Sequence, residues 1–462
     1  MPCRIALPSV LTQEEVSAWQ PGAWSPPGSS ALGRARERMA RTGQWGPAQL
    51  LGRRWSIGCV ALEVTQRCNL DCTLCYLSEM SEAVHDLPLP ELFRRIDAIA
   101  ATYGPGIGVQ ITGGDPTLRR RTDLVAIIQR VRARGLRPTL FTNGIKASRS
   151  LLAELAAAGL RDVAFHVDTT QLRKGYATEV ELNAVREEYI ARASGLPLTV
   201  FFNTTVHAGN FGEIPDVARF FVRRAEAVRV ASFQLQADTG RGIQQGRPAT
   251  ISRETVAGQI AVGAGAPVRF LSGIGHHACN LYAVTLVAGG RVHAMTDDPA
   301  LVAEALTATS GLPFDYTGKL RLFGRLMSHG LRHPGFLLRG GVWSARLLLW
   351  QMRNGLLAGR AHRLGFFIHD FMDASHLRRD RVEACAFMVA TEDGPVSMCL
   401  HNAKRDSFIL KPIHMETASE ERLWDPLLGD TSQPRHHIPI KGRVRRSEAG
   451  KRRPPNTRAA QL

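Results

Sequence analysis

Three cysteines lie within eight residues of one another, in the sequence Cys68-Asn-Leu-Asp-Cys72-Thr-Leu-Cys75. Thiolates this close in sequence can converge on one metal centre, and iron–sulfur clusters are held by cysteine thiolates. Three ligands leave one corner of a four-iron cluster without a protein ligand, which is an open coordination site. The alternative is a structural zinc site, which needs a fourth ligand, and His85 is the nearest candidate in the sequence.

The chain around these cysteines alternates apolar runs with helical patterns, which is typical of a parallel α/β unit. Strands are predicted at 57–65, 107–112, 136–141, 161–167, 196–202 and 230–236. Helices are predicted between them, near 90–103, 121–134, 148–158, 179–193 and 213–227. Six such repeats predict an α/β fold with a partial (β/α)6 parallel barrel and a C-terminal α+β extension. The cysteines directly follow its first strand.

The composition and the periodicity of apolar residues divide the 462 residues into four expected regions. These are an irregular N-terminal arm with one helix near 31–41 (1–50), the barrel (51–240), the extension (241–430) and a basic disordered tail (431–462). Within the extension we expect two strands over 278–295 and basic helices over 319–363, interrupted at Pro334 and at Gly340-Gly341. A hairpin over 385–402 should turn at Asp393-Gly394, with Cys385 and Cys399 on its two arms.

Glycines and polar side chains follow the predicted strands. In chain order they are Gly113, Gly114 and Asp115, then Asn143, then His166 and Asp168, then Asn203, and finally Gln236. Ligands of parallel α/β folds bind at the carboxyl ends of the strands. We therefore expect these residues to line one site together with the three cysteines.

On these residues, the chain resembles the radical S-adenosylmethionine (SAM) superfamily over residues 57–238. In that family the CxxxCxxC thiolates hold a [4Fe–4S] cluster, whose open iron binds the amino and carboxylate groups of SAM. Gly113-Gly114-Asp115-Pro116 resembles the GGE motif, which contacts the SAM amino group, with Asp in place of the commoner Glu. By the same resemblance Asn143, Asp168 and Asn203 are expected to bind the cofactor.

The resemblance also implies a reaction. A reductant such as ferredoxin or flavodoxin reduces the cluster, and SAM is cleaved to methionine and a 5′-deoxyadenosyl radical. That radical abstracts hydrogen from an unreactive C–H bond of the substrate. The protein orients the cofactor and holds the substrate carbon close.

Three further cysteines, Cys279, Cys385 and Cys399, lie in the C-terminal half with histidines nearby. With one histidine or an exogenous ligand they can hold an auxiliary iron–sulfur cluster. The alternative is that they are small buried apolar residues. The chain around them, with Gln234-Leu-Gln236 and Gly240-Arg241, resembles the archaeal tetraether lipid synthase group, which implies an apolar, lipid-like substrate.

The net charge of +17 is confined to two segments. Residues 435–462 carry nine Lys or Arg and one acid, and residues 319–363 carry nine and no acid. In the second segment arginines recur every seven residues, which keeps them on one face of a helix. That face is either solvated on a packed helix, bound to an anionic membrane surface, or bound to nucleic acid.

No apolar run is long enough for a signal peptide or a membrane span. With reduced cysteines, this predicts a cytoplasmic protein, with a peripheral place at the inner membrane face as the alternative. The leading hypothesis is a radical SAM enzyme with an apolar, lipid-like substrate. The alternatives are a radical SAM enzyme that modifies RNA or a nucleotide, and a non-catalytic, zinc-stabilised nucleic-acid-binding protein.

Overall fold

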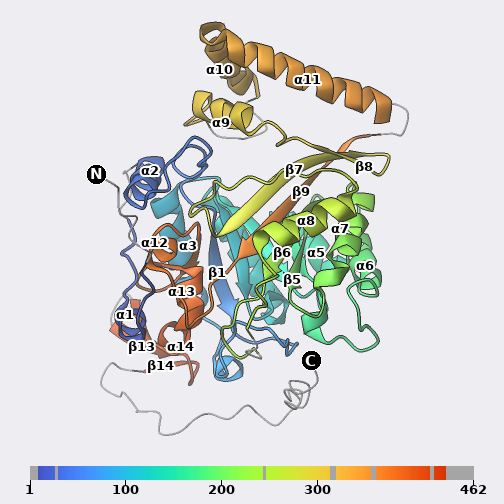
Figure 1. The fold of residues 1–462 in the computed structure, drawn as a ribbon. Helices are drawn as coiled ribbons and strands as arrows, with labels where there is room; N and C mark the ends of the chain where they lie inside the picture. The colour runs from blue at the N-terminus through green and yellow to red at the C-terminus, as the bar shows by residue number, and fades with distance from the viewer. Residues whose placement is uncertain are drawn as a thin grey trace.

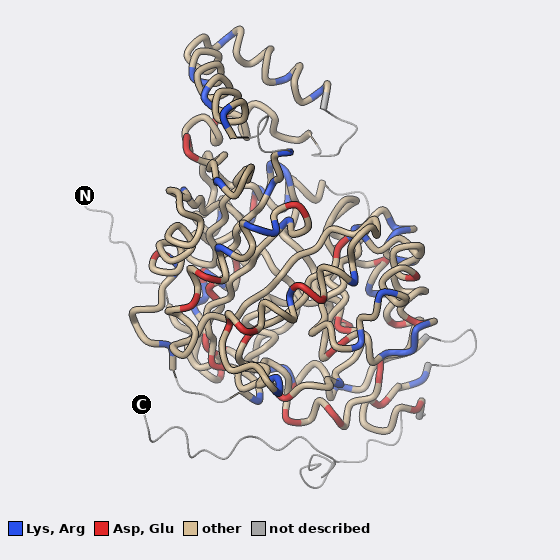
Figure 2. Tube along the Cα trace, turned by 90° about the vertical axis from the view of Figure 1, so that its right-hand side faces the viewer, with Lys and Arg blue, Asp and Glu red and all other residues tan. Residues whose placement is uncertain are grey.

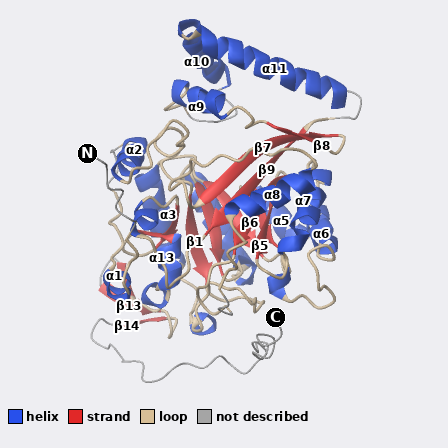
Figure 3. Ribbon diagram, in the orientation of Figure 1, coloured by secondary structure: helices blue, strands red, loops and turns tan. Residues whose placement is uncertain are grey.

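The computed structural model describes residues 9–25, 30–242, 246–312, 319–354, 360–416 and 421–432. Its centre is a curved sheet with helices on its outer face (Figures 1 and 3). The first six strands lie side by side in chain order and run parallel, which confirms the predicted partial barrel. They are β1 (Cys59–Thr65), β2 (Gly108–Gly113), β3 (Arg137–Thr142), β4 (Asp162–His166), β5 (Thr199–Val206) and β6 (Val228–Leu235).

Helices connect these strands and cover the outer face of the barrel. They are α3 (Leu89–Tyr103), α4 (Arg121–Ala133), α5 (Arg149–Ala157), α6 (Asn183–Ala193) and α7 (Ile214–Arg223). Apolar residues three or four positions apart share one side of a helix, as Leu92, Ile96 and Ile99 do in α3, where all three are fully buried. They join Val60 and Leu62 of β1 in the main core. Because side chains alternate along a strand, the intervening residues point into the barrel.

Two more parallel strands extend this sheet at its edges. Strand β10 (Phe387–Ala390) pairs with β1, and β9 (His362–Asp370), which the sequence did not predict, pairs with β6. Phe367 and His369 of β9 contact Phe387 of β10, with ring centroids 6.3 and 4.8 Å apart. These three rings, which we call the seam, close the barrel through side chains, because β9 and β10 are not hydrogen-bonded neighbours among the described strands.

Antiparallel strands complete the sheet. They are β7 (Asn280–Ala288), β8 (Arg291–Ala294) and β11 (Pro395–Ser397), and a separate sheet holds β12 (Ile413–Glu416), β13 (Glu421–Asp425) and β14 (Asp430–Ser432). The pair over 278–295 and the hairpin over 385–402 were predicted. The remaining helices of the body are α1 (Gln13–Ala18), α2 (Ala31–Arg41), α8 (Arg253–Ala264), α12 (Arg379–Glu383), α13 (Met398–Ala403) and α14 (Asp406–Ile409).

The predicted positions of the two cysteines on that hairpin were wrong. Cys399 lies in α13 rather than on a strand, and Cys385 precedes β10. After Ser397 the chain forms the short helix α13, in which Cys399, Leu400 and His401 are buried. The tail was predicted over 431–462, but residues 431 and 432 belong to β14, and the remainder lies outside the described residues.

Three helices between β8 and β9 form a separate layer at the top of Figure 1. They are α9 (Pro299–Ala308), α10 (Lys319–Arg332) and α11 (Pro334–Asn354). The predicted break at Pro334 is present, but the break at Gly340-Gly341 is wrong, because α11 continues through both glycines. Each glycine costs about 1 kcal/mol in a helix. Anchors toward the body oppose that cost: the Trp343 indole donates to Asp297 at 2.9 Å, and Trp350 packs on His293.

The helical pair α10–α11 and the cysteines lie at opposite ends of the barrel. Strand β9 is parallel to β6 and begins at His362, shortly after α11 ends at Asn354, so α11 leads into the amino ends of the parallel strands. Cys68 follows the carboxyl end of β1. A seven-residue strand spans about 23 Å, which sets the minimum separation of the two ends.

The seam makes stability depend on pH. Burial lowers the pKa of His369 to about 3, so this histidine is neutral in the folded protein. The unfolded chain binds a proton below about pH 6.5, so the stabilisation is complete above that pH and declines as the pH falls toward 3. Between pH 7 and pH 5 we expect this residue to lower the free energy of unfolding by roughly 1 to 2 kcal/mol. Urea denaturation of the wild type and of His369→Phe at both pH values measures this, and equal pH dependence in the two proteins would contradict it.

Candidate functional site

The three cysteines of the CxxxCxxC sequence lie in the loop after β1, and their side chains are partly buried. Burial raises the pKa of the Cys72 thiol, and Cys75, Asp168 and Cys68 raise it further, while the Arg241 guanidinium opposes them. Groups influence each other in this way only at short range, so the structure brings the three thiols together.

Among the described residues, no set of four zinc ligands is assembled around these thiols. In the described part of the chain, no group of three or more His, Cys, Asp or Glu side chains is arranged to hold a metal ion. Structural zinc needs four ligands on one ion. His85, the fourth ligand considered, packs beside Gly429 and donates its backbone N–H to the Pro426 carbonyl at 2.8 Å. A four-iron cluster needs thiols that are further apart, because each thiolate binds its own iron.

The glycine turn after β2 packs directly on the chain that leads to Cys68. The backbone N–H of Gly114 donates to the Thr65 carbonyl at 2.9 Å, and that of Asp115 donates to the Arg67 carbonyl at 2.8 Å. A Cβ atom on Gly114 would lie 1.9 Å from the Arg67 oxygen, so no side chain fits there. The predicted pair Gly113-Gly114 therefore lies beside the cysteine loop, and the reason is backbone contact.

The Asp115 carboxylate, which is expected to bind the cofactor, lies in a buried hydrogen-bond network. It is 1% exposed and accepts hydrogen bonds from the Thr117 N–H at 2.9 Å, the Thr142 hydroxyl at 2.9 Å and the Asn143 N–H at 2.8 Å. These bonds tie the turn after β2 to the end of β3. The carboxylate therefore fixes the walls of the site and does not face an open space.

Asn143 continues this connection to the cysteines. Its amide nitrogen donates to the Asn69 side chain at 2.7 Å and lies 3.9 Å from the Cys68 sulfur. Asn143 thus contacts a cysteine of the loop. The end of β3 is held against the centre of the site.

Asp168 and His166 form a pair at the end of β4. Asp168 is fully buried and accepts from the Thr170 N–H at 3.0 Å, the Thr205 N–H at 2.8 Å and the His166 Nε2 at 2.6 Å. Burial alone would lower the pKa of His166, but Asp168 raises it above its ordinary value. The His166 side chain is 33% exposed, so the histidine, rather than the aspartate, is presented to the barrel interior. Asn203 on β5 is its partner in the strand register.

Arg241 was missed as a site residue, although the sequence Gly240-Arg241-Gly242 carried a signal. The Arg241 side chain is fully buried, and its guanidinium donates to the Leu70 carbonyl at 3.3 Å. The backbone N–H of Arg241 donates to the Leu77 carbonyl at 2.8 Å. A Cβ atom on Gly240 or Gly242 would meet the backbone of Cys75 and its neighbours at under 3.0 Å. This segment therefore clamps the cysteine loop from the side opposite to β2 and places a cation beside it.

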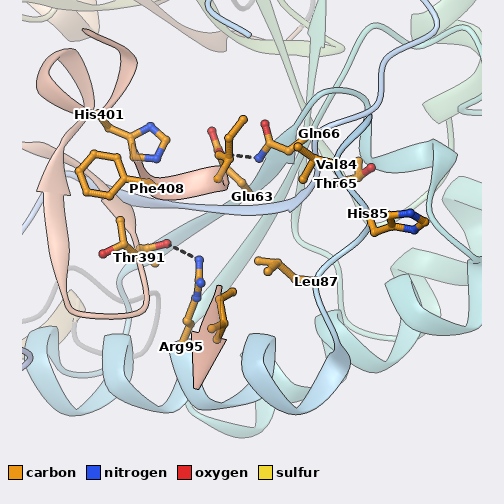
Figure 4. Close-up of a pocket in the computed structure, with 13 residues that line it drawn as sticks. Glu63, Thr65, Gln66, Val84, His85, Leu87, Arg95, Thr391, His401 and Phe408 are labelled. Carbon is orange, nitrogen blue, oxygen red and sulfur yellow. Dashed lines mark hydrogen bonds between the residues drawn. The ribbon is translucent and has the colours of Figure 1, made fainter. Parts of the chain in front are cut away.

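A second buried arginine reaches the site from the C-terminal extension. Arg405 donates to both carboxylate oxygens of Glu63 on β1, at 2.7 and 2.8 Å, and lies over the ring of Tyr76 at 4.7 Å. Burial would raise the pKa of Glu63, but Arg405 and its neighbours hold it at about 2. The Tyr76 hydroxyl donates to the Gly113 carbonyl at 2.6 Å. Figure 4 shows the pocket beside Glu63, with Gln66, His401 and Phe408 at its wall.

That pocket is not the candidate substrate site. Its lining contains none of the three cysteines and no residue from the ends of β3 to β6. It marks instead the junction between β1 and the extension. Arg241 and Arg405 are both buried near the cysteine loop, and carboxylates compensate their charges: Asp71 and Glu82 lie beside Arg241, and Glu63 pairs with Arg405.

The three C-terminal cysteines lie near the seam and near one another. Burial raises the pKa of Cys399, and Cys385 and Cys279 raise it further. Each sulfur already has a protein partner: Arg381 Nε donates to Cys279 at 3.3 Å, the Met372 N–H donates to Cys399 at 3.4 Å, and Cys385 donates to the Phe387 carbonyl at 3.1 Å. They are therefore grouped as the sequence suggested, but as hydrogen-bonded thiols.

One of the histidines near this second group, His276, already has two partners. His276 places Nε2 at 3.1 Å from the Asp380 carboxylate, and its Nδ1 accepts from the Ala278 N–H at 3.0 Å. Both ring nitrogens are used, so His276 is not free to complete a set with the three thiols.

Comparison with known proteins matches the barrel. The family model described as the Radical SAM superfamily matches residues 62–221. The chain is 29% identical over 187 residues to 7,8-dihydro-6-hydroxymethylpterin dimethyltransferase of Methanocaldococcus jannaschii, covering 39% of this chain and 36% of that protein. It is 30% identical over 209 residues to PqqA peptide cyclase of Xanthomonas euvesicatoria, covering 44% and 53%.

A third relative has a nucleotide in its name. The chain is 34% identical over 162 residues to "Probable GTP 3',8-cyclase" of Pyrococcus abyssi, covering 34% of this chain and 51% of that protein. The chain thus spans about half or less of the length of these relatives. The family model covers most of the barrel with its cysteine loop, and the names of the three relatives carry three different substrates.

The packing of Gly114 gives a steric prediction. Gly114→Ala pushes a methyl group into the Arg67 and Gln66 carbonyls, and we expect it to lower the free energy of unfolding by roughly 1 to 3 kcal/mol. Gly108→Ala, at the start of the strand that leads to this turn, is the matched control, because the nearest atom to its Cβ is Cys59 Cβ at 3.9 Å. Urea denaturation compares the two. Equal stability of both variants would show that the turn does not pack on the cysteine loop.

Proposed function

We propose that the radical SAM domain of this chain holds a [4Fe–4S] cluster through Cys68, Cys72 and Cys75 and binds SAM at its open iron. The observation that carries the proposal is the loop itself. Three grouped thiols follow β1 inside the matched region, and two glycine turns and two buried arginines hold them. When bound and reduced, the cluster supplies the electron that cleaves SAM.

The protein's own residues bind, orient and shield. Gly113 and Gly114 allow a close approach of backbone to the loop, and Asn143 and Asn203 offer amide groups at the ends of β3 and β5. Asp168 positions His166 and raises its pKa, which favours the protonated imidazolium. We assign His166 to the wall of the substrate space. The seam closes the barrel and excludes water from its interior.

The first candidate substrate is apolar and lipid-like, with hydrogen abstracted from an unactivated C–H bond. Phe141 and Phe201 alternate with buried core residues on β3 and β5, so their rings point into the barrel together with Phe367 of the seam. Apolar walls of this kind suit a hydrocarbon chain. The resemblance of the C-terminal half to lipid-modifying enzymes also favours an apolar, lipid-like substrate.

The second candidate is a nucleotide or RNA. His166, Asn203 and Gln234 share the interior with those rings, and the buried Ser232 hydroxyl of β6 has no hydrogen-bond partner within the described chain. Unpaired buried polar groups are costly and favour a ligand that can pair with them. One relative is named for GTP.

Cys279, Cys385 and Cys399 are proposed to hold an auxiliary iron–sulfur cluster. Their grouping and the Arg381 guanidinium beside them support this, since a cluster would replace the present thiol hydrogen bonds. The fourth ligand would be another nearby histidine or an exogenous group, because His276 is engaged by Asp380.

The proposed partner for electron supply is a ferredoxin or flavodoxin, and the proposed location is the cytoplasm. Nucleic acid remains a proposed partner only for the second candidate substrate. The membrane contact expected for residues 319–363 is independent of this chemistry and concerns the other end of the barrel.

Removal of one thiol should abolish the chemistry. The anaerobically purified wild type should contain about four irons per chain, or about eight with an auxiliary cluster, and form 5′-deoxyadenosine from SAM under dithionite. Cys72→Ala should form none. Iron, sulfide and 5′-deoxyadenosine are measured together.

Cys59→Ala is the matched control, because this cysteine is buried in β1 and lies outside the CxxxCxxC sequence. It should retain both cluster and cleavage. Cys399→Ala should lose about four irons only if the auxiliary cluster exists, and it should keep the first cluster. Bound zinc in place of iron, or no cleavage by a fully loaded protein, would refute the radical SAM proposal and favour a zinc-stabilised binding protein.

Deuterium transfer from a labelled substrate to 5′-deoxyadenosine distinguishes the two substrate classes. With a phospholipid deuterated along its acyl chains, we expect deuterium in the 5′-deoxyadenosine product, because hydrogen is abstracted from the hydrocarbon. A ribose-deuterated guanosine nucleotide should give none. Mass spectrometry of the product decides, and label from the nucleotide alone would establish the second candidate.

A further inference from the structure

The helical pair α10–α11 exposes an unusual amount of apolar surface. Of the seventeen large hydrophobic side chains exposed in the described part of the chain, nine lie on these two helices. They are Leu320, Phe323, Met327, Leu331, Leu338, Val342, Leu348, Leu349 and Met352. Leu320 is 87% exposed, Leu331 74% and Leu338 71%. Contiguous exposed apolar surface of this kind marks an interaction site.

These side chains form stripes on the side of each helix away from the body. In α11 the buried or half-buried residues Phe336, Trp343, Leu347 and Trp350 recur at spacings of seven, four and three. The exposed stripe recurs at similar spacings, from Leu338 through Val342 and Leu349 to Met352. At 100° per residue, these two sets lie on nearly opposite sides of the helix. One side is therefore anchored to the body, and the other has no partner in the described chain.

Arginines border both exposed stripes. Together α10 and α11 contain six arginines, one lysine and no acid, and the blue segments of Figure 2 mark them along both helices. Arg339, Arg346 and Arg353 are seven residues apart on one edge of the α11 stripe. Arg339 also pairs with Glu304 of α9. Arg346 and Arg353 are exposed, and with Leu349 they line an open hollow between α11 and the β7–β8 turn.

We propose that the α10–α11 pair lies on an anionic membrane surface, with its apolar stripes in the lipid interface and its arginines at the phosphate groups. Charge complementarity selects this occupant. A second copy of the pair would bring two sets of seven like charges together, which is unfavourable. Nucleic acid offers no partner for the exposed leucines, since its backbone binds through charge. In the described residues no helix is long and apolar enough to cross a membrane, so the contact is parallel to the surface.

Flotation of the full-length protein with vesicles tests this. The wild type should bind vesicles of phosphatidylcholine with phosphatidylglycerol, and it should bind pure phosphatidylcholine at least tenfold more weakly. Arg325→Gln/Arg346→Gln/Arg353→Gln should weaken binding to the anionic vesicles on the order of 100-fold, since each basic residue contributes about a factor of five to ten. Phe323→Ser/Leu331→Ser/Leu338→Ser/Leu349→Ser should lose binding to both.

Matched controls carry the same changes on the body. Arg120→Gln/Arg161→Gln/Arg223→Gln removes three exposed arginines, and Ile145→Ser/Val180→Ser/Val262→Ser/Leu428→Ser removes four exposed apolar residues. Both should bind within twofold of the wild type, and circular dichroism should show that all variants are folded.

Three results would overturn the proposal. The first is a folded wild type that does not bind anionic vesicles, and the second is equal loss of binding in the control variants. The third is a dimer or a protein complex that the apolar variants dissociate while vesicle binding is absent, which would assign the surface to protein. None of these outcomes depends on SAM cleavage, so they are separate from a failure of the proposed enzyme activity.

Discussion

The buried ion pair between Glu63 and Arg405 joins the parts of the molecule that the candidate site depends on. Glu63 belongs to the first strand, five residues before Cys68, and Arg405 comes from the far end of the chain. Breaking one partner of such a pair leaves an uncompensated charge and is strongly destabilising. Through Tyr76 the same arginine reaches the Gly113 carbonyl. The C-terminal extension is therefore part of the site's framework, although the matched family region ends at residue 221.

Around this pair, the cysteine loop is held by backbone as much as by side chains. The turns at Gly113-Gly114 and Gly240–Gly242 contact it from two sides, at distances that only glycine allows. Asp115 and Asp168 use their carboxylates to tie strand ends together. A site held in this way is preorganised, since its donors need not move when a ligand binds. It leaves Asn143, His166 and Asn203 as the side chains that we propose to contact a ligand.

The barrel could be predicted from the sequence because its strands and helices are local patterns that end at glycines and helix caps. The glycines after the second predicted strand also marked the turn that packs on the cysteine loop. The backbone hydrogen bonds of Asp115 and Asp168 could not be predicted. An aspartate at a strand end looks the same in the sequence whether its carboxylate faces a ligand or a backbone N–H. Strand β9 was missed because it pairs with β6 and with β7, both distant in sequence. The continuous α11 was missed because tertiary anchors such as Trp343 outweigh two glycines. Arg405 carried no local signal at all.

The placement of the α10–α11 pair at the amino ends of the strands has a topographical consequence. A molecule resting on those helices would hold the open end of its barrel away from the bilayer, by at least the length of a strand, about 23 Å. An electron-transfer protein could then dock from the aqueous side without competing for the lipid surface. A carbon deep in the same bilayer would be out of reach of a site at the opposite end. A lipid substrate would therefore have to leave the membrane, or be delivered by a carrier, before its C–H bond could react.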